Sequence, residues 1–184
     1  MSPRVNPSKL QWIKKPSLYI ISSDKLVVET EPYTSFHMDK EKNTAVRLVG
    51  KPRKEFDISA MIEYNFKHPE DECGLVVEID ETHWIKFGIK RENNELNHIF
   101  VEKYDGHEKD YSERDFGIGI DAMYLKIKYH DGRILFQYGF NKDRFWTARE
   151  IQFEKEYIVT VGIYACSPGN SYFDCTFSSL EMNE

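Results

Sequence analysis

Hydrophobic and polar residues alternate along most of this chain of 184 residues. The clearest alternation runs over residues 74–90, where apolar side chains occupy every second position on both sides of an acidic turn. Because successive side chains of a strand point to opposite faces of a sheet, this pattern predicts a β-hairpin with one wholly apolar face. Glu78, Trp84 and Lys86 lie on the other face of this hairpin.

The same period of two predicts further strands, and no segment shows the 3.6-residue period of a long amphipathic helix. Strands are expected at 18–21, 25–30, 45–49, 56–64, 97–104, 124–130, 133–138, 157–165 and 172–177, and loops at 31–43, 105–119 and 141–147. Asp131-Gly132 between two of these strands favours a tight hairpin turn. About ten to twelve short strands must bury their faces against one another, which predicts an all-β sandwich or barrel. We expect one domain over 1–184, with its core at about 12–180.

Composition narrows the function classes. The chain has 12 Phe, 11 Tyr and 3 Trp, which favours strands, and its net charge of −6 argues against a nucleic-acid partner. We expect no membrane segment, because no apolar run approaches the ~20 residues that span a bilayer. The amino terminus lacks the apolar stretch of a signal peptide. Cys73, Cys166 and Cys175 fit no metal motif, so we expect free thiols and a cytoplasmic location.

Metal and cofactor sites are not expected. The six histidines show neither His-x-His nor His-Glu-x-x-His spacing, and the aspartates lack the spacing of calcium ligands. Gly117-Ile118-Gly119 has no third glycine, so it does not form a phosphate-binding loop.

Three segments together resemble a known family. They are residues 74–89, the Ala165–Pro168 turn followed by residues 173–177, and Thr34-Ser35-Phe36. This combination resembles the regulation-of-enolase-type domain of unknown function in the concanavalin A-like lectin/glucanase superfamily, which is similar to C-terminal β-sandwich modules of some xylosidases. The resemblance implies a concanavalin A-like jelly roll of two antiparallel sheets, with a concave face that usually meets glycans. The loop motif often reads Thr-Asp-Phe-Trp, whereas this chain has Ser35 and His37 at the Asp and Trp positions.

A non-catalytic carbohydrate-binding-like or interaction module is the favoured function. An indole can stack on a sugar ring, and a lysine can bind hydroxyls or the phosphate of a sugar phosphate. The expected ligand groove consists of Trp84, Lys86, Glu78 and Tyr164, with Phe36 and His37 at its rim. A competing interpretation buries Trp84 as a structural residue beneath residues 31–43 or 105–119.

Two other functions remain open. A weak glycoside hydrolase would need Glu78 and a second carboxylate, Glu63 or Glu102, facing each other within ~9.5 Å across a cleft. A protein-binding metabolic regulator would instead show a large apolar patch and no groove. We also expect a homodimer, because the exposed edge strands of a sheet can pair with those of a second copy.

Overall fold

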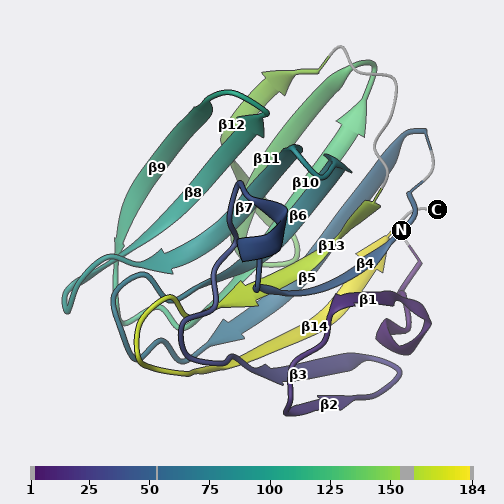
Figure 1. Ribbon diagram of the computed structural model, residues 1–184. Helices are drawn as coiled ribbons and strands as arrows, with labels where there is room; N and C mark the ends of the chain where they lie inside the picture. The colour runs from purple at the N-terminus through teal and green to yellow at the C-terminus, as the bar shows by residue number, and fades with distance from the viewer. Residues whose placement is uncertain (1–2, 53, 154–159, 183–184) are drawn as a thin grey trace.

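The computed structural model, which describes residues 3–52, 54–153 and 160–182, is a sandwich of two antiparallel seven-stranded sheets (Figure 1). The first sheet has the order β1 (Gln11–Lys14), β4 (Val46–Gly50), β13 (Thr160–Cys166), β6 (Glu72–Asp80), β7 (His83–Arg91), β8 (Leu96–Asp105), β9 (Lys109–Gly117). The second has the order β12 (Arg144–Gln152), β11 (Arg133–Asn141), β10 (Ala122–His130), β5 (Phe56–Tyr64), β14 (Asp174–Met182), β3 (Lys25–Glu29), β2 (Tyr19–Ile21). Two single-turn 3₁₀ helices, η1 (Pro7–Lys9) and η2 (Lys40–Lys42), complete the described elements. The predicted all-β, jelly-roll-like sandwich is confirmed.

The core lies between the two sheets and is built from the faces that the alternation predicted. In the β6–β7 hairpin, Leu75, Phe87 and Ile89 are completely buried. The Phe87 ring meets Phe136 of β11 edge-on, with the ring centroids 5.5 Å apart, and so joins the two sheets. Asp131-Gly132 forms the predicted turn, since both residues have positive φ.

Two expected loops contain strands instead. Residues 105–119 contain β9, and residues 141–147 contain the start of β12. β9 is one edge strand of the first sheet and β12 is one edge strand of the second, and both lie on the same side of the sandwich. An edge strand is held by backbone hydrogen bonds to a single neighbour, so its side chains need not alternate between core and solvent. In β9 no side chain is fully buried, which explains why its sequence carries no clear period. β1 was also missed, and residues 157–159 of the expected strand 157–165 lie outside the described residues.

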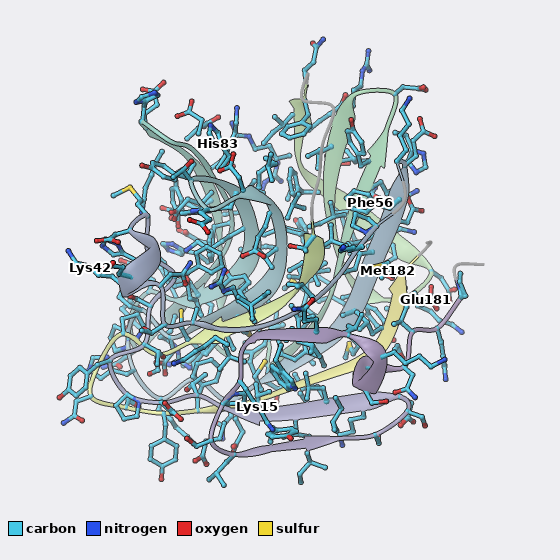
Figure 2. All side chains as sticks on the ribbon, turned by 45° about the vertical axis from the view of Figure 1, so that its right-hand side comes forward. Lys15, Lys42, Phe56, His83, Glu181 and Met182 are labelled. Carbon is cyan, nitrogen blue, oxygen red and sulfur yellow. The ribbon has the colours of Figure 1, made fainter. Side chains whose placement is uncertain are left out.

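The predicted loop 31–43 crosses the outer face of the first sheet. We call residues 34–45 the strap. In Figure 1 the strap, with η2 at its centre, lies across β6, β7 and β13, and in Figure 2 Lys42 of η2 lies on the side of the molecule away from Phe56 and Met182 of the second sheet.

Hydrogen bonds hold the strap at both ends. The backbone oxygen of Ser35 accepts bonds from the amides of Thr44 (2.9 Å) and Ala45 (3.0 Å), which closes the strap into a loop. Thr34 donates its amide to the oxygen of Ser167 and accepts the Ser167 amide on its hydroxyl at 2.9 Å. The strap is therefore fastened to the chain that follows β13.

Two further expectations concern cysteines and membranes. Cys73, Cys166 and Cys175 are buried and form no disulfide. Within residues 3–52, 54–153 and 160–182, no helix has the length and apolar character needed to cross a bilayer.

Candidate functional site

The outer face of the first sheet carries aromatic side chains above glycines. Tyr164 of β13 pairs with Gly74 of β6, which pairs with Gly88 of β7, which pairs with Phe100 of β8. A Cβ atom added at Gly88 would collide with the Tyr164 hydroxyl. The absence of side chains at these glycines therefore makes room for the aromatic rings beside them.

The strap inserts Phe36 among these rings. Phe36 meets Trp84 edge-on, with the centroids 4.9 Å apart, and meets Tyr164 at 5.5 Å. The three side chains are only 6%, 2% and 0% exposed. The alternation correctly placed Trp84 on the outer face, but the expectation of an open groove is wrong. The strap covers this face because Phe36 supplies the apolar surface that the rings need, as the competing interpretation of Trp84 expected.

Lys86 is buried beneath the same strap with its own counter-ions. Its ammonium lies 2.9 Å from a carboxylate oxygen of Glu72 and 3.6 Å from one of Glu102, and the residue is 4% exposed. Burial would lower the pKa of Lys86, but the two carboxylates outweigh it and raise that pKa. Four ring centroids lie 5.4–5.8 Å from the ammonium: those of Phe36, Trp84, Phe100 and Tyr164. Lys86 therefore stabilises the strap interior, contrary to the expectation that it faces a ligand.

Glu78 lies at the edge of the covered region and is fully engaged. One carboxylate oxygen forms an ion pair with Arg47 of β4, and the other accepts the Thr160 hydroxyl at 2.9 Å. The Arg47 guanidinium also stacks on Phe36, with its central carbon 5.3 Å from the ring centroid. Arg47 thus links the strap to the Glu78 end of the sheet.

A pocket opens beside this ion pair. We call it the strap pocket. Its volume is about 330 Å³, and it is lined by Ile13, Asn43, Arg47, Glu78, Ile79, Asp80, Glu81, Trp84 and Thr160. Of the expected site residues it brings together Glu78 and Trp84, and it does not include Lys86, Tyr164, Phe36 or His37.

Three lining side chains of the strap pocket carry unsatisfied polar atoms. Asn43 Oδ1, Arg47 Nε and Trp84 Nε1 are buried, and none has a hydrogen-bond partner among the described residues. Most buried polar groups in proteins have such partners, so a group of exceptions calls for an explanation. A cavity of about 520 Å³, which shares Ile79 with the strap pocket, is larger, but no side chain that lines it carries an unsatisfied buried atom in the described part of the chain.

The rim of the strap pocket is acidic. Asp80 accepts hydrogen bonds on one oxygen from the amide of Thr82 (2.7 Å) and contacts the His83 ring at 2.8 Å. Burial would raise the pKa of Asp80, but the hydrogen bonds with His83 and Thr82 outweigh it and lower that pKa to about 2. Asp80 is therefore ionised at any physiological pH.

The remaining predicted site residues lie apart from the strap pocket. His37 is half-buried within the strap, where its Nδ1 accepts the amide of Asp39 at 2.9 Å. Tyr164 is completely buried, its hydroxyl has no partner in the part of the chain that the structure describes, and burial raises its pKa well above the usual value.

The structure does not assemble the proposed hydrolase pair. Glu63 belongs to β5 of the second sheet, and Glu102 forms ion pairs with Lys86 and, at 2.9 Å, with Lys109. Neither residue lines the strap pocket with Glu78.

Sequence reasoning missed Asn43, Arg47 and Thr160 as lining residues. Arg47 carried a signal, because it is the only charged residue in the otherwise apolar strand Ala45–Val49. Asn43 and Thr160 carried none, since polar residues near strand ends are common. Sequence reasoning also left unexplained why Thr34 and Ser167 both belong to recognisable motifs, which the hydrogen bonds between them now explain.

Comparison with known proteins identifies the family. A family model described as "Protein of unknown function (DUF1349)" matches residues 12–184. The chain belongs to this family. A curated relative is similar to this chain: Regulation of enolase protein 1 of Saccharomyces cerevisiae is 22% identical over 175 residues, which span 93% of this chain and 87% of the relative.

Solved structures support the same fold for this DUF1349 chain. A functionally unknown protein from Saccharomyces cerevisiae superposes with a TM-score of 0.87 at 21% identity, covering 97% of this chain and 98% of that one. A xylan β-1,4-xylosidase from Bacillus halodurans superposes with a TM-score of 0.73 at 14% identity, and all of this chain covers 40% of the enzyme. At these identities the likeness shows the β-sandwich and confirms the resemblance to xylosidase modules.

Proposed function

We propose that this protein is a non-catalytic binding module whose strap pocket holds one small polyhydroxylated ligand, a monosaccharide or a sugar derivative. The observation that carries the proposal is the set of three buried polar atoms without partners on its lining side chains. Leaving such an atom unsatisfied costs about 1–3 kcal/mol, and a ligand that supplies a partner removes that cost.

The chemistry of the three atoms suits a sugar. Arg47 Nε and Trp84 Nε1 can only donate hydrogen bonds, whereas Asn43 Oδ1 can only accept one. A hydroxyl group both donates and accepts, so adjacent hydroxyls on one ring can serve donors and an acceptor together. The volume of about 330 Å³ lies at the small end of ligand pockets, which favours a single sugar ring over an oligosaccharide.

The charges of the site argue against acid–base catalysis. A general acid needs a pKa near the working pH, and the pKa of Asp80 is about 2. Both oxygens of Glu78 are occupied by Arg47 and Thr160. The likeness of the fold to a xylosidase module is consistent with a sugar ligand, and the buried free thiols are consistent with a cytosolic location.

Two-dimensional NMR with ¹⁵N-labelled protein tests the proposal. Xylose, glucose and glucosamine are titrated to tens of millimolar while the three indole N–H signals are followed, with assignment by Trp12→Phe and Trp146→Phe variants. We expect the Trp84 indole and the Asn43 side-chain amide to shift with a saturable dependence on at least one sugar. Unchanged Trp84 and Asn43 signals with all three sugars would reject the proposal.

The matched control is a variant in which a larger side chain fills the strap pocket. Ile13 lines the strap pocket and is 45% exposed, so Ile13→Trp fills the pocket without removing core contacts. Ile20, which is 70% exposed on β2, gives the comparison variant Ile20→Trp. Ile13→Trp should abolish the sugar-dependent shifts, and Ile20→Trp should leave them intact. Shifts that persist in folded Ile13→Trp would place the binding elsewhere.

A second candidate function is a protein-binding regulator, which the name of the yeast relative favours. The surface for this role would be the edge strand β2 with the residue before it, since Ile20 of β2 and the preceding Leu18 are 70% and 62% exposed. Sedimentation velocity with purified enolase tests it, with Leu18→Lys/Ile20→Lys as the disrupting variant and Ile118→Lys, at a distant exposed position, as the control. Absence of a complex at tens of micromolar would reject this role, and the protein alone in the same experiment tests the expected homodimer.

A further inference from the structure

We infer that closure of the strap is coupled to ligand binding: the strap pocket is complete only while the strap lies on the sheet, and a ligand in the pocket holds the strap closed. This inference rests on the proposed function. It adds a conformational equilibrium to the site that the three unsatisfied atoms define.

All three unsatisfied atoms of the pocket depend on the strap. Asn43 is itself a strap residue that lines the pocket. Arg47 stacks on Phe36 of the strap, and Trp84 meets the Phe36 ring edge-on. Lifting the strap would remove the first of these groups from the pocket and would take away the ring that packs against the other two. A ligand that bonds to all three atoms therefore needs the closed strap.

The strap is held on the sheet by few buried side chains. Among the strap residues whose side chains the structure describes, only Thr34, Phe36 and Ala45 are buried. Thr34 and Ala45 lie at the two ends, so Phe36 is the one described side chain between them that is buried against the sheet. A segment with so few buried contacts opens at a lower free energy than the strands beneath it.

The size of the coupling follows from linkage. Binding and closure favour each other by the same factor, because coupling between two equilibria is reciprocal. If the open form does not bind the ligand, the open population falls by the factor 1 + [L]/Kd. A sugar at about three times its Kd therefore lowers the population of the open strap about fourfold.

Hydrogen exchange at two remote amides reports the opening of the strap. The Ser167 amide donates to the Thr34 hydroxyl at 2.9 Å, and the Thr34 amide donates to the Ser167 oxygen at 3.0 Å. Ser167 is completely buried, and neither residue lines the strap pocket. Both bonds break when the strap detaches at this end, so these amides follow the strap and not direct contact with a ligand.

The experiment measures this exchange by NMR without ligand and with the sugar that shifts the Trp84 indole most, chosen from xylose, glucose and glucosamine. Without sugar, the two amides should exchange faster than that of Phe87, which lies on a central strand paired on both sides. With the sugar at about three times its Kd, they should exchange about fourfold more slowly. The amides of Ser22 and Glu29, which are hydrogen-bonded at the β2 edge of the second sheet, should keep their rates.

Variants separate coupling from direct contact. Phe36→Ala changes no side chain that lines the pocket, yet it should speed the exchange of Ser167 and weaken sugar binding about fivefold or more, because apparent affinity falls with the closed fraction. Phe36→Leu should change both quantities in the same direction by less. Tyr33→Ala, at an exposed position, should change neither. The filled-pocket variant Ile13→Trp should lose the slowing by sugar. Thermal denaturation confirms that each variant is folded.

The outcomes separate the two proposals. A sugar that shifts the Trp84 indole but leaves the exchange of Thr34 and Ser167 unchanged would overturn the coupling and leave the sugar site standing. Exchange of these two amides no faster than that of Phe87 without sugar would also overturn it, because the strap would then open only when the whole domain unfolds. No response to any of the three sugars would overturn the sugar site itself and the inference with it.

Discussion

Replacing Lys86 by methionine tests the most unusual feature of the covered face. Methionine keeps the length and apolar stem of lysine but removes the charge that Glu72 and Glu102 share. Both carboxylates are nearly buried, with side chains about one-tenth exposed, so Glu72 would remain as an uncompensated buried charge and Glu102 would keep only the 44% exposed Lys109 as a partner. Breaking a buried ion pair by removing one partner costs about 3–5 kcal/mol. We expect Lys86→Met to lower the free energy of unfolding by that amount.

Urea denaturation followed by tryptophan fluorescence measures this loss. Lys126→Met is the matched control, because Lys126 is also a strand lysine with an acidic partner, Asp57 at 3.8 Å, but its side chain is 22% exposed. Its loss should stay below about 1 kcal/mol, because the Lys126–Asp57 pair is partly exposed and Asp57 keeps His130 as a second partner at 2.7 Å. The variant Lys86→Met/Glu72→Gln/Glu102→Gln should recover most of the stability that Lys86→Met loses, because it leaves no buried charge.

The pH dependence has a definite sign. In the wild type, the folded-state pKa of Lys86 is raised, so its contribution is complete below the unfolded value of about 10.4 and is lost as the pH rises through the folded value. A Lys86→Met variant that loses no more stability than Lys126→Met would refute the reasoning.

Three further predictions concern the strap and its surroundings. Phe36→Ala should lower the free energy of unfolding by about 3–5 kcal/mol and make Trp84 accessible to acrylamide quenching. Tyr33→Ala, at a position that is 69% exposed, should change neither quantity. Quenching of Phe36→Ala like that of the wild type would contradict the covering role of Phe36. Gly88→Ala should lower the melting temperature, because its Cβ would collide with the Tyr164 hydroxyl and would lie 2.8 Å from the backbone oxygen of Cys73. Gly119→Ala should not lower it, because the space around Gly119 is open. An equal effect of both substitutions would argue against the close approach at Gly88. Because the folded-state pKa of Asp80 is lowered, its stabilising contribution should disappear as the pH falls from about 4 to about 2. Asp80→Asn should therefore flatten the dependence of the melting temperature on pH in that window. Identical profiles for the wild type and the variant would contradict this prediction.

The sequence predicted the interior of the fold better than its edges. Strands in the middle of each sheet pack one face on the core, so β5 and the β6–β7 hairpin show the period of two that located them. β9 and β12 are edge strands, and their backbone hydrogen bonds to a single neighbour leave the choice of side chains free. The apolar period did not find these two strands, although it did locate the short edge strand β2.

The sequence predicted on which face of the sheet the candidate site residues lie, but not whether that face is exposed to solvent. The period of two shows which face of a sheet a side chain is on, and Trp84 and Lys86 do lie on the outer face. It does not show whether water or another segment covers that face. A signal was present, however, because Val76, Phe100 and Tyr164 are apolar or aromatic residues on the same outer face. Strands buried on both faces typically read as nearly continuous apolar runs, as Leu75–Val77 does.

Arg47 explains why the pocket lies at the margin of the strap. Its guanidinium stacks on Phe36 and forms an ion pair with Glu78, so one residue ends the aromatic interior and begins the polar rim. Lys86 is enclosed by carboxylates and aromatic rings, including Phe36 of the strap, and it does not line the strap pocket. Among the described residues that line the strap pocket, Arg47 is therefore the basic residue that a ligand would contact. Because Arg47 also stacks on Phe36 of the strap, a ligand that binds Arg47 would act directly on the segment that covers Trp84.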